Sequence, residues 1–105
     1  MRLGIKEKDI QKGILEYLSY RKGFFWRNNS GGFRDIKNHF YRFGLKGSPD
    51  ILGIIPPDGR LVAIEVKSAT GQMTDDQRWF QEQVEKHGGV YVLARSVQDV
   101  IERNL

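Results

Sequence analysis

The fold of this chain is decided by residues 47–67, which read GSPDILGIIPPDGRLVAIEVK. Two apolar runs, 51–55 and 61–64, flank the sequence PPDG at 56–59. Proline and glycine at these positions are typical of a tight turn, and apolar runs on either side of a turn are typical of paired strands. The sequence therefore predicts a β-hairpin.

A symmetric turn determines which residues of the two strands face each other. Ile55 then faces Arg60, and the pairing continues outward until Asp50 faces Glu65. Because side chains alternate along a strand, Lys67 projects to the same side as Glu65. Like charges that face each other across a ladder are destabilising, so this arrangement of two carboxylates and an ammonium needs a reason.

A divalent cation would supply that reason, because Mg²⁺ takes oxygen ligands from one or two carboxylates and leaves its other positions to water and phosphate. The backbone carbonyl of Val66 is a further candidate oxygen ligand between Glu65 and Lys67. The Lys67 ammonium could orient or deprotonate a water, or stabilise charge on a phosphate. The alternative is that Asp50 only starts a strand, with Glu65 and Lys67 on a solvated edge, and a bulge at the turn would favour it.

These residues resemble a known signature. PD at 49–50 followed by EVK at 65–67 is similar to the PD-(D/E)xK motif of the restriction-endonuclease-like nucleases. Gly47, the short spacing, and Thr74 with Gln77 downstream resemble in particular the virus-type replication-repair nuclease (VRR-NUC) domain. The similarity extends over nearly the whole chain.

This resemblance implies a Mg²⁺- or Mn²⁺-dependent DNA endonuclease that hydrolyses phosphodiester bonds in replication, repair or recombination. It implies homodimers that act on branched DNA such as four-way (Holliday) junctions, and no small-molecule cofactor. It also implies that an acid on the first helix, here Glu7, joins the metal directly or through water. The candidate catalytic residues are Glu7, Asp50, Glu65, Lys67 and Gln77, and the candidate metal ligands are Asp50, Glu65, the Val66 carbonyl and Glu7.

Glu7 and Gln77 each allow a second interpretation. Residues 6–20 show the apolar spacing of an amphipathic helix, at Ile10, Ile14 and Leu18. Glu7 lies at the N-terminal end of that face, so it either complements the helix dipole or points toward the metal. Gln77 closes a capping box with Thr74, so it either caps the next helix or faces the metal.

The net charge of +4 is unevenly distributed along the chain. Residues 20–46 contain seven Lys and Arg against one acid, a local charge of +6, which suits a polyanion beside a metal site. Basic side chains can neutralise phosphate, and interleaved aromatics can stack on bases. The candidate nucleic-acid-binding residues are Arg27, Asn29, Ser30, Arg34, Lys37, Arg42 and Lys46.

Two parts of this basic segment leave alternatives open. The polar, Gly-rich residues 28–32 could bring backbone N–H groups to a phosphate, or form an ordinary turn. We expect residues 33–45 to form a long loop that is partly mobile without substrate. Of its four aromatics, we expect at least two to pack in the core: Phe33, Phe40, Tyr41 and Phe43.

The remaining pattern predicts one α/β domain over residues 1–105, a mixed β-sheet flanked by helices in the order αβββαβ(α), which is a restriction-endonuclease-like core. A strand at 24–27 precedes the hairpin, and a helix at 74–87, a strand at 90–93 and a short helix capped by Ser96 follow it. The absence of cysteine excludes disulfides and thiolate zinc sites.

No run of eighteen apolar residues and no secretory signal is present, so we expect an intracellular, cytoplasmic protein without a membrane partner. Two alternatives to a nuclease remain at this point. One is a non-catalytic nucleic-acid-binding module, and the other is an accessory subunit of a larger assembly.

Overall fold

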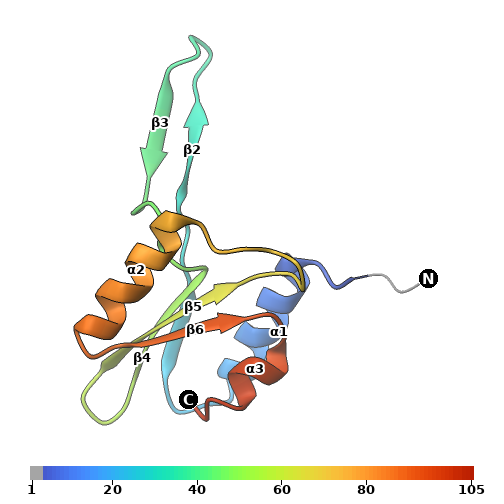
Figure 1. Ribbon diagram of the computed structural model, residues 1–105, viewed down its shortest axis with the longest axis vertical. Coiled ribbons are helices and arrows are strands. Elements are labelled where there is room, and N and C mark those ends of the chain that lie inside the picture. The colour runs from blue at the N-terminus through green and yellow to red at the C-terminus, as the bar shows by residue number, and fades with distance from the viewer. Residues whose placement is uncertain (1–3) are drawn as a thin grey trace.

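The computed structural model describes residues 4–105, which form a four-stranded sheet with helices on both faces and a separate two-stranded sheet (Figure 1). The elements in chain order are α1 (Glu7–Leu18), β1 (Phe24–Arg27), β2 (Gly31–Arg34), β3 (Phe40–Phe43), β4 (Ile51–Ile55), β5 (Arg60–Val66), α2 (Asp75–Lys86), β6 (Val90–Ala94) and α3 (Val97–Ile101). None of the helices within this described part is long and apolar enough to cross a membrane.

The main sheet has the strand order β1-β4-β5-β6. Strand β4 pairs antiparallel with both β1 and β5, whereas β6 pairs parallel with β5 after the chain has passed through α2. A parallel pair needs such a crossover, because a tight turn can join only antiparallel strands. The mixed sheet flanked by helices that the sequence predicts is therefore confirmed.

The hairpin of β4 and β5 has the predicted register. Ile55 pairs with Arg60 and Ile51 pairs with Ile64, so no bulge interrupts the ladder. Gly59 closes the turn with a φ of +77°, a conformation that glycine adopts without the steric cost other residues have. The next pair beyond Ile51 and Ile64 consists of the two acids.

The two faces of β5 serve different cores. Val62, Ile64 and Val66 are fully buried against α1 and α3 on one face. Ala63 lies on the other face and packs with Val84 of α2. Because the alternation continues, residue 65 projects toward the α2 side, at the end of the strand.

The helices begin and pack as the sequence predicts. The apolar stripe of α1 is buried, at Ile10, Ile14 and Leu18. Thr74 and Gln77 form the capping box of α2: Gln77 N donates to Thr74 Oγ1 at 3.2 Å, and Thr74 N donates to Gln77 Oε1 at 2.9 Å. Ser96 Oγ accepts from Asp99 N at 3.3 Å at the start of α3.

The prediction of a loop over residues 33–45 is wrong. Strands β2 and β3 pair there as an antiparallel hairpin, which we call the arm, and Figure 1 shows it projecting beyond the main sheet. The turn is closed by Asp35, whose Oδ1 accepts from the N–H groups of Lys37 and His39 at 2.9 Å each. This is a local side-chain turn of the kind that Asp favours.

The expectation that two of the four arm aromatics join the core is also wrong. All four are about half exposed, at 56% for Phe33, 52% for Phe40, 47% for Tyr41 and 46% for Phe43. Phe33 and Tyr41 stack on each other and Phe40 lies under two arginines instead, because a two-stranded arm has no layer beneath it to bury its side chains.

Candidate functional site

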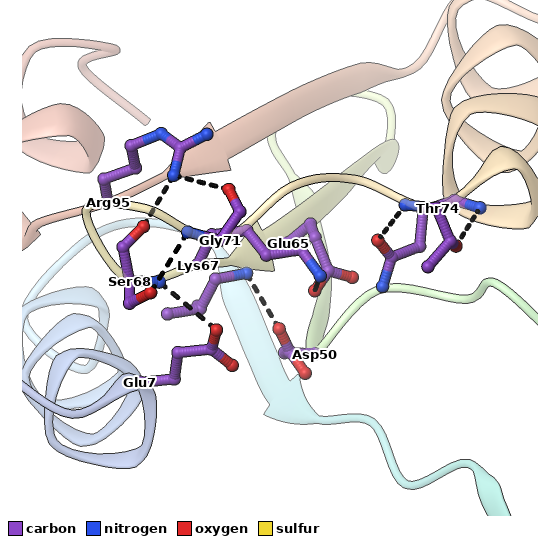
Figure 2. Close-up of polar contacts among 10 residues, drawn as sticks. Glu7, Asp50, Glu65, Lys67, Ser68, Gly71, Thr74 and Arg95 are labelled. Carbon is purple, nitrogen blue, oxygen red and sulfur yellow. Dashed lines mark hydrogen bonds and ion pairs between the residues drawn. The ribbon is translucent and has the colours of Figure 1, made fainter.

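The open end of the β4–β5 hairpin brings Asp50 and Glu65 together (Figure 2). Asp50 immediately precedes β4, and its Oδ2 accepts from the backbone N–H of Val66 at 2.8 Å. The carbonyl of Asp50 accepts from Asn28 N, also at 2.8 Å, where the chain leaves β1. The side chain of Asp50 is therefore held by β5, and its main-chain carbonyl is held by the residue that follows β1.

Glu65 is a buried carboxyl group, with only 3% of the residue exposed. Burial is the largest cause that raises the pKa of Glu65 to about 9, and a hydrogen-bonding interaction with Asp50 and the charge of that carboxylate act in the same direction. The charge of Glu7 adds to the effect, whereas the ammonium of Lys67 opposes it. The carboxyl group of Glu65 therefore keeps its proton at neutral pH.

Lys67 lies beside this pair, with Nζ 3.9 Å from Glu65 Oε2 and its side chain 12% exposed. An ammonium this little exposed is unusual without a partner. The interpretation of Glu65 and Lys67 as the solvated face of an edge strand is therefore wrong. Strand β5 is interior to the sheet, between β4 and β6.

Glu7 reaches the same region from α1. Its Oε1 accepts from the backbone N–H of Ser68 at 3.2 Å, just after β5 ends (Figure 2). The carboxylate also occupies the first turn of its helix, where the dipole favours it. The helix-dipole interpretation of Glu7 fits this position, and its role beside a metal stays a prediction.

Arg95 is a structural residue of this region that sequence analysis missed. Its Nη1 donates to the carbonyls of Ser68 at 2.5 Å and Gly71 at 2.8 Å, so it closes the connector that follows β5 (Figure 2). A single arginine after the last strand belongs to no motif, so only the fold reveals its role.

Gly47 joins the site to α2. It has a φ of +83°, and a Cβ added there would lie 2.4 Å from the carbonyl oxygen of Asp76. Only glycine allows this close approach of the chain to the helix, two residues before Pro49. Lys46 next to it forms an ion pair with Asp76, with Nζ 3.2 Å from Oδ2.

Gln77 carries the capping role described above, so that interpretation is confirmed. Its role beside a metal stays a prediction.

The hydroxyl of Tyr91 is buried and lacks a hydrogen-bond partner among the described residues. Burial, followed by the charges of Glu65 and Asp50, raises the pKa of Tyr91, so the hydroxyl keeps its proton as an available donor near these acids.

Within residues 4–105, no three side chains of His, Cys, Asp or Glu are grouped closely enough to hold a metal by themselves. The donors present are the facing carboxylates of Asp50 and Glu65, with backbone oxygens beside them. Such a set suits Mg²⁺, which binds through one or two carboxylates and retains several waters.

The residues predicted to contact nucleic acid fall into two groups. Arg34, Lys37 and Arg42 lie on the arm, whereas the others lie along its base, at Arg27, Asn29, Ser30 and Lys46. Asn28, which sequence analysis did not single out, fixes that base: its Nδ2 donates to Ser48 Oγ at 3.0 Å and to the Pro49 carbonyl at 2.9 Å.

Comparison with known proteins places this arrangement in a family. A family model described as the VRR-NUC domain matches residues 6–98, most of the chain. The chain belongs to the VRR-NUC family. The matched range includes every candidate catalytic residue of this VRR-NUC domain, from Glu7 to Gln77.

A solved structure titled "VRR_NUC domain" shares the fold of this VRR-NUC chain, with a TM-score of 0.67 and 23% sequence identity. The alignment covers 94% of this chain and 97% of the other. No curated protein sequence matches. Family membership makes this a nuclease-type domain, with DNA as the partner that such a domain implies.

Proposed function

We propose that this protein is a Mg²⁺- or Mn²⁺-dependent DNA endonuclease that hydrolyses phosphodiester bonds, with a preference for branched DNA such as four-way junctions. The observation that carries the proposal is the meeting of Asp50 and Glu65, close enough for Asp50 to raise the pKa of Glu65, beside the Lys67 ammonium. Two acids held this close at a strand end have a high electrostatic cost that a bound cation would remove.

The residues present fit a divalent cation. Asp50, Glu65 and the Val66 carbonyl would hold it, and Glu7 would join directly or through water. The raised pKa of Glu65 supports this assignment, because a cation that replaces the shared proton leaves both carboxylates ionised. When bound, such an ion activates a water nucleophile and neutralises charge on the phosphate.

The chain's own groups would do the rest of the work. Lys67 would orient the attacking water or stabilise the charge that develops on the phosphate, and its low exposure would strengthen that interaction. Glu7 positions the end of β5 through its bond to Ser68 N–H. Gln77, which caps α2, would add a polar contact near the metal.

DNA would bind to polar and basic side chains of the arm and its base. These are Arg27, Asn29, Ser30, Arg34, Lys37, Arg42 and Lys46. These groups read phosphate rather than base edges, so binding would be sequence-tolerant and strongly dependent on salt. We propose a homodimer as the active form, which sedimentation of the purified protein would measure directly.

The test compares cleavage of linear, flapped and four-way-junction DNA in Mg²⁺, Mn²⁺ or EDTA. The parent should cleave only with metal. Lys67→Ala should lower the cleavage rate by about 10²- to 10³-fold, because it removes one electrostatic stabiliser, while DNA affinity changes little.

Lys86→Ala is the matched control, because it also removes one lysine charge. Lys86 lies in the last turn of α2, at the end of that helix farther from Gln77 and the candidate site. It should leave cleavage unchanged. A parent that leaves every DNA intact in both metals would refute the nuclease proposal, and retained DNA affinity in that case would favour the non-catalytic binding module. Weak DNA binding with no response to metal would favour the accessory subunit.

A further inference from the structure

The arm has two chemically different faces. Paired residues project to the same side of a ribbon, and so do residues two apart along a strand. Phe33 pairs with Tyr41, and Phe43 lies two residues beyond Tyr41, opposite Gly31. These three side chains therefore form one uncharged face, which we call the aromatic face.

The opposite side of the ribbon is cationic. Arg34 pairs with Phe40, and Arg42 pairs with Gly32, so all of these residues lie on the second face. Both guanidinium groups lie over the Phe40 ring, at 5.4 Å for Arg34 and 5.5 Å for Arg42. This arginine face is thus held in place by cation–π contacts, and both arginines are exposed.

The aromatic face is a preformed, exposed apolar surface. The rings of Phe33 and Tyr41 are stacked, with centroids 5.4 Å apart and planes at 22°. Figure 1 shows the arm standing clear of the main sheet, and the three rings are between 46% and 56% exposed. An isolated two-stranded hairpin is only marginally stable in water, so an arm that exposes such a surface is suited to a partner that covers it.

We propose that the arm is a wedge for branched DNA. Its aromatic face stacks on the exposed base pair at a branch point, and its arginine face contacts the phosphate backbone of the neighbouring duplex. The inference rests on the proposed function in taking branched DNA as the ligand, and it adds which part of the chain recognises the branch.

The two faces together favour this partner over a continuous duplex. Inside a duplex each base pair is covered by the next, so only the groove edges are available and aromatic side chains have no base face to stack on. A branch point exposes the flat face of a base pair, which aromatic side chains can stack on without regard to sequence. A second, anionic duplex then lies on the other side of the ribbon, where the arginines are.

The arm also lies close to Asp50 and Glu65. Phe33 is five residues from Asn28, whose N–H donates to the Asp50 carbonyl at 2.8 Å. At about 3.3 Å per extended residue plus one strand spacing of about 4.8 Å, Phe33 lies within roughly 21 Å of Asp50. DNA rises about 3.4 Å per nucleotide, so cleavage is expected within about six nucleotides of the branch point.

The test measures DNA affinity in EDTA, so that cleavage plays no part. The ligands are a four-way junction and a relaxed, covalently closed circular duplex, which exposes no base pair. The double variant Phe33→Leu/Tyr41→Leu keeps apolar side chains but removes the stacking surface, and it should lower the preference for the junction about tenfold. Arg34→Gln/Arg42→Gln should weaken binding and reduce the salt slope by about two.

Tyr20→Leu is the matched control, since it removes an exposed aromatic ring outside the arm and should keep the parent's preference. Urea unfolding checks that each variant folds, and Tyr41→Leu alone carries the same comparison if the double variant does not.

A double variant that keeps the parent's junction preference would overturn the wedge, as would a parent that shows none. Sedimentation provides a third outcome: if the leucine variant turns a dimer into a monomer, the aromatic face joins two copies of the chain and the proposal is wrong. Failure of the nuclease proposal is separate, because it appears as absent cleavage in Mg²⁺ and Mn²⁺ whatever the affinities in EDTA.

Discussion

Replacing Glu65 by glutamine should change how the stability of the metal-free protein depends on pH. Glu65 is almost fully buried, and its pKa rises from 4.5 to about 9 on folding because of burial and of the facing Asp50. Its folded-state pKa is thus above the unfolded value, so its contribution to stability is fully present below pH 4.5 and is lost as the pH rises toward 9. Glutamine has a similar shape and does not titrate.

The size of the effect follows from this window. Between pH 5 and pH 7 the Glu65 carboxyl group is mostly ionised in the unfolded chain and almost fully protonated in the folded chain, so the folded state binds nearly one proton more throughout this range. One proton per pH unit corresponds to about 1.4 kcal/mol, so the parent should lose about 2.5 kcal/mol relative to Glu65→Gln over this range. Comparing the two proteins removes the contribution of other titrating groups that they share.

Urea unfolding in EDTA at pH 5, 6 and 7 measures this difference. The control is Glu82→Gln, because Glu82 is exposed on α2 and its variant should follow the parent curve at every pH. If the curves of the parent and Glu65→Gln stay parallel within about 0.5 kcal/mol, Glu65 does not keep its proton in the folded state and our account of the site is wrong.

Adding Mg²⁺ extends the same experiment. A cation bound at tenfold its dissociation constant stabilises the folded state by about 1.4 kcal/mol. The parent should gain this stability at pH 7, and Glu65→Gln should gain much less because it lacks one ligand.

Three further predictions concern residues around the site. Gln77→Ala should cost about 1 kcal/mol in urea unfolding, since it removes half of the capping box, and an unchanged midpoint would contradict the observed cap. Gly47→Ala should destabilise the protein by at least about 1 kcal/mol, because φ is +83° and the new Cβ meets the Asp76 carbonyl; a stable variant by thermal unfolding would refute this. Arg95→Gln should loosen residues 68–71, which faster amide hydrogen exchange there would show and unchanged protection would contradict.

The central hairpin could be predicted from the sequence because its determinants are local. The turn residues fix the register, and period-two alternation then assigns each side chain to a face. The pairing of Ile55 with Arg60 and of Ile51 with Ile64 follows directly, as does the meeting of Asp50 and Glu65.

The arm could not be predicted because its stability comes from contacts between side chains that no periodic pattern reveals. Its strands contain two glycines, Gly31 and Gly32, and alternate arginine with aromatic residues, a composition that also suits a loop. The Asp35 turn was the available signal, since an aspartate side chain often accepts hydrogen bonds from backbone N–H groups a few residues on and so closes a tight connection.

The roles of Glu7 and Arg95 lie between these cases. A helical pattern places Glu7 at the end of α1, but where that helix end docks depends on the tertiary structure. Arg95 bonds only to backbone carbonyls of the connector, and such a contact leaves no trace in the spacing of residue types.

The bond between Asp50 and Val66 joins residues only 16 positions apart, whereas the bond between Glu7 and Ser68 joins residues 61 apart. Closing a short loop costs less entropy than closing a long one, so contacts of low sequence separation tend to form first. We therefore expect the facing acids to assemble as soon as the hairpin closes and Glu7 to arrive only when α1 docks. If the proposed ligands are correct, a partly folded chain would carry an incomplete set of them, which would keep it from cutting DNA before folding is finished.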